Sequence, residues 1–204
     1  TTYRTKTTAA FIESLKKQFG DFYLVPEGGS NLLGVKGCME IMNEPTAISD
    51  KPTVKFDYVC CACGTGATLA GVTLSLKPGQ KAIGFSVLKG GEFLNGEVER
   101  FVEGYKNTHR LGSTEAPPAL PAGRLSRGDF NVCSEYHFGG YAKTTPELLA
   151  FKKAFEELHK IPLDQVYTAK MMFGLYDLVK KNYFKPGSKI IALHTGGLQG
   201  NPQI

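Results

Sequence analysis

Short apolar runs alternate with helix-forming segments along almost the whole chain, and this alternation limits the folds open to it. Strand-like runs are DFYLV (21–25), FDYVCCA (56–62), KAIGFSVL (81–88), FNVCSEY (130–136) and SKIIALH (188–194). Such alternation is typical of α/β domains whose parallel strands are joined by right-handed crossovers. The sequence therefore predicts an open, mostly parallel, twisted sheet with helices on both faces.

The helices are expected where apolar residues recur with a helical period. These segments are residues 7–19, 67–76, 97–106, 145–160 and 165–184. Thr145 stands directly before Pro146, an order that suits an N-cap followed by the first helical position. Residues 107–128 are rich in Pro and Gly and are expected to form a long irregular loop.

Three glycine-rich loops each follow an expected strand. They are PEGGSN (26–31), CGTGAT (63–68) and HTGGLQG (194–200). In open α/β sheets the ligand lies outside the carboxyl ends of the strands, and parallel strands end at the same edge. We therefore expect the three loops to meet at one edge and to form a ligand site there.

The second loop has the composition of a cradle for one phosphate group. Gly64 and Gly66 let the backbone approach a ligand closely, and the helix expected from Ala67 has an N-terminal dipole that favours an anion. Thr65 and Thr68 add hydroxyl groups. Neither the nucleoside-triphosphate loop nor the dinucleotide fingerprint matches. The other interpretation is a tight strand-to-helix turn in which small residues are needed only for packing.

Composition narrows the classes of protein further. The net charge of +5 is modest and the basic residues are interleaved with acids, which does not favour a nucleic-acid partner. No apolar run approaches the ~20 residues that span a bilayer, so no membrane partner is expected. The five cysteines lack the spacing of zinc ligands, so no metal is expected. They are expected to be reduced, buried thiols, which indicates a cytoplasmic protein. The alternative is that Cys63 is a nucleophile at a helix N-terminus.

Five motifs occur in order: PEGGSN, CGTGATLAG, GGYAK, VYTAK and HTGG. This set resembles the D-cysteine desulfhydrase / 1-aminocyclopropane-1-carboxylate (ACC) deaminase family of pyridoxal-phosphate enzymes, which has the tryptophan synthase β-like fold (fold type II). The resemblance implies pyridoxal 5′-phosphate as cofactor, a small amino acid as substrate and a homodimer.

The resemblance also assigns roles to particular residues. The expected phosphate-binding residues are Gly64, Thr65, Gly66, Ala67 and Thr68. Tyr141 and Tyr167 match the two tyrosines that the family places near the cofactor and the substrate. Thr168 is expected to face the pyridine nitrogen, and Thr195 and Gly196 lie near the same atom. From residue type alone, Tyr167 could instead be a packed aromatic and Thr168 a helix cap.

Thr168 and Thr195 bear on which of the family's two activities is expected. A threonine hydroxyl can hydrogen-bond to the pyridine nitrogen but cannot hold a proton on it as a carboxylate would. Thr168 and Thr195 depart from the pattern of ACC deaminases and match that of D-cysteine desulfhydrases. The expected activity is therefore α,β-elimination of D-cysteine to pyruvate, ammonia and sulfide. The alternatives are ACC deaminase and a catalytically inactive homologue that binds a phosphate-bearing ligand.

The resemblance covers the C-terminal two-thirds of the family's chain. Residues 1–204 are expected to form mostly the larger cofactor-binding domain, and residues 1–50 to border the smaller one. The family's Schiff-base lysine stands in a Gly-Gly-Asn-Lys setting that this sequence does not contain, so the chain alone is expected to be inactive. Asn31 and His194 are expected to have structural roles, as a helix cap and a strand-end side chain, and Lys170 is expected to be structural or paired with an acid.

Overall fold

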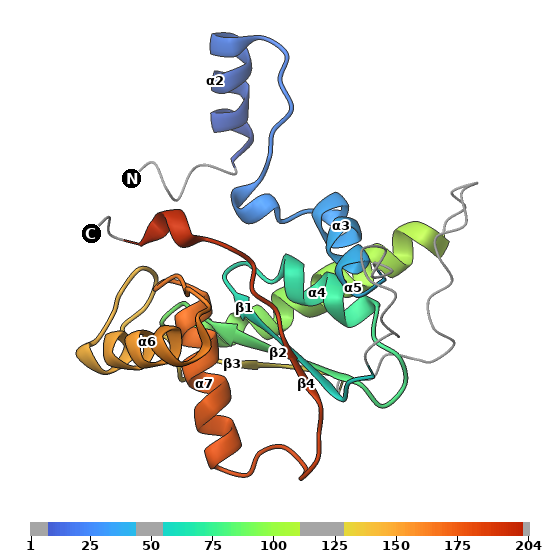
Figure 1. Cartoon of the computed structure of the whole chain (residues 1–204). Helices are drawn as coiled ribbons and strands as arrows, with labels where there is room; N and C mark the ends of the chain where they lie inside the picture. The colour runs from blue at the N-terminus through green and yellow to red at the C-terminus, as the bar shows by residue number, and fades with distance from the viewer. Residues whose placement is uncertain (1–7, 44–54, 111–128, 202–204) are drawn as a thin grey trace.

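The computed structural model describes residues 8–43, 55–110 and 129–201, and within them it forms one parallel sheet covered by helices (Figure 1). The strands are β1 (Tyr58–Cys63), β2 (Lys81–Ser86), β3 (Phe130–Cys133) and β4 (Ile190–Ala192). Their order in the sheet is β3-β2-β1-β4, and each neighbouring pair is parallel. The prediction of a parallel α/β sheet is confirmed.

Helices follow the strands as the periodicity predicts. They are α2 (Ala9–Phe19), α3 (Leu32–Asn43), α4 (Ala67–Leu74), α5 (Leu94–Arg110), α6 (Pro146–His159) and α7 (Thr168–Lys180), with short 3-10 turns η1 (Glu27–Gly29), η2 (Gly91–Phe93) and η3 (Leu198–Gly200). The Thr145 side chain accepts a hydrogen bond from the backbone N–H of Leu148, so the predicted cap of α6 is confirmed. The side chain of Asn31 accepts from Gly34 N in the same way at the start of α3.

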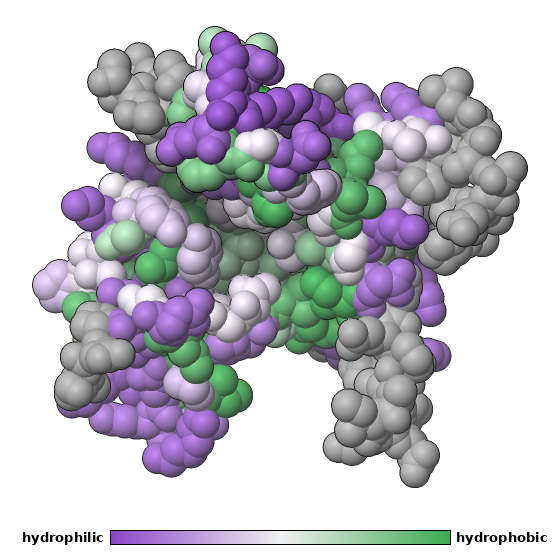
Figure 2. Space-filling view, turned by 90° about the horizontal axis from the view of Figure 1, so that it is seen from above, coloured by the Kyte–Doolittle hydropathy of each residue, from purple (hydrophilic) through white to green (hydrophobic). Residues whose placement is uncertain are grey.

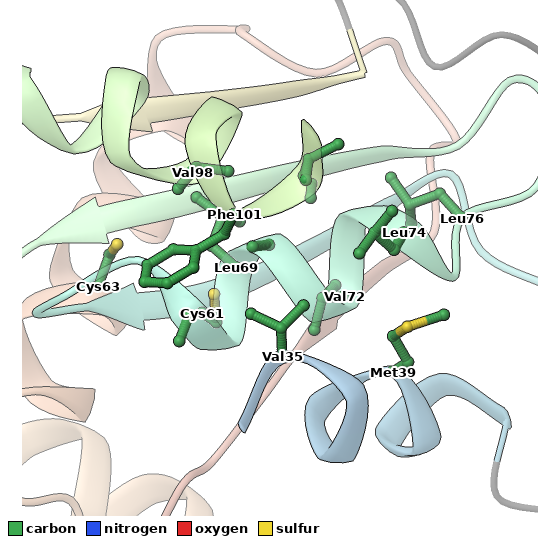
Figure 3. Close-up of a cluster of buried hydrophobic side chains, with 14 of the residues drawn as sticks. Val35, Met39, Cys61, Cys63, Leu69, Val72, Leu74, Leu76, Val98 and Phe101 are labelled. Carbon is green, nitrogen blue, oxygen red and sulfur yellow. The ribbon is translucent and has the colours of Figure 1, made fainter. Parts of the chain in front are cut away.

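Both faces of the sheet are buried, because side chains of β1 alternate between two apolar clusters. Cys61 and Cys63 lie in the cluster that α3, α4 and α5 form with the sheet, together with Leu69 and Phe101 (Figure 3). Cys60 faces the opposite cluster, whose members come from β2, β3 and α7. A third cluster joins α6 to α7. The expected helices on both faces of the sheet are therefore present.

The expectations for two strand-like runs need correction. Residues 21–25 form no strand; Phe22, Tyr23, Leu24 and Val25 are exposed, and a run of β-forming residues needs a neighbouring strand to pair with. The run at 188–194 does contain β4, but the strand lies at the sheet edge and is only partly buried. Of the irregular loop expected at 107–128, residues 107–110 belong to α5 and residues 111–128 lie outside the described residues.

Candidate functional site

A cavity of about 890 Å³ opens at the carboxyl ends of β1 and β4. Seen from above, this face of the molecule is hollowed near its centre, with neutral and apolar residues around the hollow (Figure 2). The lining comes from the three glycine-rich loops that the sequence singles out, represented by Gly28, Thr65 and Thr195, and from Tyr141 and Tyr167. The prediction that these loops meet is confirmed, but the first loop follows no strand, so only the loops after β1 and β4 lie here as ends of parallel strands. Such a volume falls within the range of about 300–1,000 Å³ that is usual for small-molecule sites.

The loop between β1 and α4 turns sharply so that the helix begins at the cavity wall. Gly66, the N-cap of α4, has a φ of 92°, a left-handed conformation that L side chains rarely adopt. Gly64, Thr65 and Thr68 line the cavity, whereas Gly66 and Ala67 are buried behind it. The free N–H groups of the first turn of a helix and its dipole favour an anion at such a position.

The first loop packs closely against this one. The hydroxyl of Ser30 donates a hydrogen bond to that of Thr65. A Cβ atom at Gly28, whose φ is +65°, would lie 2.8 Å from Thr65 Oγ1. The first loop therefore holds the Thr65 side chain in place at the cavity.

These groups fit the phosphate of pyridoxal phosphate. A phosphate needs hydrogen-bond donors and a positive local potential, and hydroxyl groups together with a helix N-terminus supply both. Thr65 and Thr68 are such hydroxyls, and Gly64 leaves the backbone accessible: a Cβ there would meet only the ring of Tyr167, at 3.6 Å. The remaining volume of the cavity lies towards the two tyrosines and Thr195.

The two tyrosines predicted near the site are in contact with each other. Tyr167 Oη donates to Tyr141 Oη at 3.2 Å, and their rings meet edge to face with centroids 6.0 Å apart. Tyr141 follows two glycines and is 57% exposed. Burial, followed by the hydrogen bond to Tyr141, raises the pKa of Tyr167 above its ordinary value, so its hydroxyl stays protonated at neutral pH.

Thr168 lies elsewhere, although it follows Tyr167 directly. It is fully buried, and its hydroxyl donates to Asp164 Oδ2 at 2.7 Å and accepts from Asp164 N at 2.9 Å. It is not among the residues that line the cavity. The expected contact between Thr168 and the pyridine nitrogen stays a prediction, and it would require this hydroxyl to leave the carboxylate.

Asp164 is the residue that sequence reasoning missed. Asp164 is 1% exposed, and its carboxylate is bonded within the protein: Oδ1 accepts hydrogen bonds from Val166 N at 2.9 Å and from Tyr167 N at 2.6 Å. Oδ2 accepts from Thr168 N at 2.8 Å, so the carboxylate caps the start of α7 in place of Thr168. An Asp three residues before Tyr167 was the available signal, since that spacing is typical of a capping side chain.

The loop after β4 brings Thr195 and Gly196 to the cavity, as predicted. His194 fixes this loop: Gly196 N donates to its Nδ1 at 3.2 Å, and its Nε2 lies 2.8 Å from the Pro162 carbonyl oxygen. Since Nδ1 accepts, Nε2 carries the proton and donates it to Pro162. The predicted structural role of His194 therefore agrees with its hydrogen bonds.

The four cysteines of β1 and β3 do not supply a nucleophile to the cavity. Cys60, Cys61, Cys63 and Cys133 are free thiols and all four are buried. Burial raises the pKa of Cys63 to about 12, so almost no thiolate forms at neutral pH. The alternative role of Cys63 as a nucleophile is disfavoured for this reason.

A parallel α/β sheet with a glycine- and threonine-rich loop, a helix N-terminus and two tyrosines at its carboxyl edge has the architecture of α/β proteins that bind phosphate-bearing ligands. Residues 2–196 match the sequence family described as pyridoxal-phosphate dependent enzymes, and the chain belongs to that family. Its members depend on the cofactor that the motifs predict.

Within this family, the chain is similar to proteins named for two related activities. A putative ACC deaminase of Pyrococcus horikoshii is 31% identical over 192 residues, which cover 92% of this chain and 53% of that protein. A bifunctional, mitochondrial D-cysteine desulfhydrase/ACC deaminase of Arabidopsis thaliana is 33% identical over 95% of this chain and 46% of its own length. A D-cysteine desulfhydrase of Klebsiella pneumoniae is 30% identical over 86% of this chain and 50% of its own.

A solved structure agrees with these relatives. The crystal structure of an ACC deaminase homologue matches with a TM-score of 0.74 at 29% identity, covering 98% of this chain and 57% of that chain. The predicted family and fold are therefore confirmed. The chain spans about half the length of the curated relatives it matches, and those relatives carry both activity names.

None of the helices in the described part of the chain is long and apolar enough to cross a membrane.

Proposed function

We propose that this chain forms the cofactor-binding part of an enzyme that eliminates sulfide from D-cysteine. The observation that carries the proposal is the pair of tyrosine hydroxyls, 3.2 Å apart, on a cavity that also holds the Thr65–Thr68 loop. D-Cysteine and water give pyruvate, ammonia and hydrogen sulfide, a balance that needs no oxidant or reductant. Bound pyridoxal phosphate supplies the electron sink that takes up the electron pair left at the substrate Cα.

The chain's own residues would divide the remaining work. The hydroxyls of Thr65 and Thr68 and the N-terminus of α4 would hold the phosphate and so orient the cofactor. Tyr167 stays protonated and lines the cavity, and its Oη would give its proton to the departing sulfur atom when the O–H turns from Tyr141 to the substrate. Before substrate binds, Tyr141 accepts the hydrogen bond from that hydroxyl and keeps it at the cavity wall. Thr195 would contribute a hydroxyl near the pyridine nitrogen.

ACC deamination is the second candidate function. Two observations favour it: the Pyrococcus horikoshii relative bears that name, and the matching crystal structure is of an ACC deaminase homologue. The residue types at 168 and 195 favour the desulfhydrase instead, because both are threonines where the ACC pattern has Glu and Leu. Thr168 carries less weight than Thr195 here, since its hydroxyl is bonded to Asp164.

The whole protein is proposed to be a homodimer. Residues 1–204 would form mostly its larger domain, and residues 1–50 would border the smaller one. The match of nearly the whole chain to 57% of a longer homologous chain supports a chain that forms only part of the whole protein.

The deciding experiment measures the products that the full-length protein with pyridoxal phosphate forms from D-cysteine, L-cysteine and ACC, assayed side by side. Sulfide and pyruvate from D-cysteine alone would support the desulfhydrase. 2-Oxobutyrate from ACC would support the second candidate and would mean that the threonines at 168 and 195 do not decide the reaction. Cofactor binding without product from any of the three would favour an inactive homologue.

Replacing Thr68 with valine is expected to weaken pyridoxal phosphate binding about tenfold or more, because a hydrogen bond to a charged group contributes about 1.5–3 kcal/mol. Equilibrium dialysis gives the affinity directly. Pyridoxal, which lacks the phosphate, should bind with unchanged affinity. The matched control is Thr73→Val: Thr73 lies on the same helix, but its hydroxyl donates to the Leu69 carbonyl and does not reach the cavity. Equal affinities for wild type and Thr68→Val would exclude a phosphate contact at this residue.

A further inference from the structure

We propose that Lys170 is a positioning residue that holds Tyr141 in contact with Tyr167. The Lys170 side chain extends from α7 and is fully buried, at 0% exposure. Its Nζ donates to two backbone carbonyl oxygens, those of His137 at 2.9 Å and Gly140 at 2.7 Å. Both carbonyls belong to the loop that ends at Tyr141.

This loop needs such support because its backbone conformation is unfavourable. Phe138, Gly139, Gly140 and Ala142 all have positive φ, with values of 51°, 95°, 118° and 55°. Non-glycine residues in this region cost about 1–3 kcal/mol each and persist only where surrounding contacts hold them. Within the loop, Gly140 N donates to the His137 carbonyl, and the Lys170 ammonium bridges the two ends of that same turn.

Lys170 and Tyr167 act on the loop from the start of α7. Tyr167 is the N-cap residue and Lys170 lies in the first turn, three residues later, a spacing that brings both side chains to the same side. The ammonium holds the backbone just before Tyr141, and the Tyr167 hydroxyl reaches the hydroxyl of Tyr141 itself. The start of α7 is in turn fixed by the buried carboxylate of Asp164. The separation of the two tyrosine hydroxyls therefore depends on where Lys170 holds the loop.

Burying the ammonium group of Lys170 costs free energy, and packing alone would not require an amine at this position. Burial lowers the pKa of Lys170 to about 8, although the Asp164 carboxylate acts in the opposite direction. A methionine would fill similar space without losing the hydration of an ammonium group. The amine is thus useful at this place as a hydrogen-bond donor to the loop.

The first test measures the structure without cofactor or substrate, as amide hydrogen exchange of the full chain. Lys170→Met should speed exchange over residues 137–143 about ten- to hundredfold, because two hydrogen bonds from a charged donor are lost. Exchange of α7 should stay within about twofold of wild type. The matched control is Lys180→Met, since Lys180 is exposed on the same helix. If Lys170→Met does not fold, Lys170→Gln retains two N–H donors and should give a smaller increase, confined to the same loop.

The second test rests on the proposed function and uses turnover of D-cysteine. If Lys170 acts through Tyr141, the double variant Lys170→Met/Tyr141→Phe should be about as slow as Tyr141→Phe alone; independent roles would multiply the losses. Unchanged exchange of residues 137–143, exchange that rises equally over α7, or multiplied losses would overturn the inference. Faster loop exchange without product from any substrate would support the role of Lys170 and contradict the proposed function instead.

Discussion

Replacing Tyr167 with phenylalanine is expected to lower kcat for the proposed elimination of D-cysteine by about 10²- to 10⁴-fold, the usual contribution of a positioned proton donor. The physical reason is that the Tyr167 hydroxyl stays protonated, because burial and the hydrogen bond to Tyr141 raise its pKa. Tyr167 also lines the cavity in which we propose that the substrate binds. The phenylalanine ring keeps the packing, so the affinity for pyridoxal phosphate should change little. Steady-state kinetics and a cofactor titration on the same preparations measure both quantities.

The chain offers a close control for this variant. Tyr176 lies on the same helix, and its hydroxyl bonds to His159 Nε2 at 2.9 Å, away from the cavity. Tyr176→Phe should therefore keep kcat within about twofold of wild type, as expected for a surface substitution. A Tyr167→Phe enzyme with undiminished kcat would show that this hydroxyl moves no proton in the rate-limiting step. In that case Tyr141, whose hydroxyl also faces the cavity, becomes the remaining candidate.

The sequence predicts the strands and loops of the site well because local signals determine them. Tyr58–Cys63 is an apolar run of strand length, and two glycines follow it at the turn into α4, of which Gly66 has a positive φ. Since the strands are parallel, the loops that follow β1 and β4 must meet at one edge. Their meeting at a common cavity therefore follows from strand order and motif position, without knowledge of any contact.

What the sequence does not predict depends on tertiary contacts. Thr168 follows Tyr167 directly, but its position in the first turn of α7 turns its hydroxyl to the Asp164 carboxylate rather than to the cavity. The reach of Lys170 to the Gly140 carbonyl joins segments 30 residues apart. Residues 21–25 have strand propensity, yet pairing rather than propensity decides whether a strand forms. The deciding partner of Lys170 is distant in sequence, and residues 21–25 pair with no strand in the described part of the chain. The partner of Thr168 is near, since Asp164 stands four residues earlier, and there the turn at the start of α7 decides which group the hydroxyl meets.

Replacing Gly71 with alanine is expected to destabilise the protein by about 2–3 kcal/mol, the cost of overpacking a close helix contact. Gly71 lies on α4 against α3, where a Cβ would stand 2.5 Å from both Cys38 Cβ and the Val35 carbonyl oxygen. Because a backbone atom cannot move aside alone, α3 must shift. Ser30, just before α3, would then lose its contact with Thr65, so pyridoxal phosphate affinity should fall as well. Urea unfolding gives the free energy, and dialysis gives the affinity.

The same pair of helices supplies the matched control. Gly37 lies on the exposed side of α3, and a Cβ there would have nothing within 4 Å. Gly37→Ala should therefore stabilise the protein by up to about 1 kcal/mol, since alanine is the better helix former. Opposite signs for the two substitutions would establish that the close approach of α3 to α4 supports the phosphate-binding loop. A Gly71→Ala protein within about 0.5 kcal/mol of wild type, the usual range of an inconsequential surface change, would mean that the two helices separate at little cost.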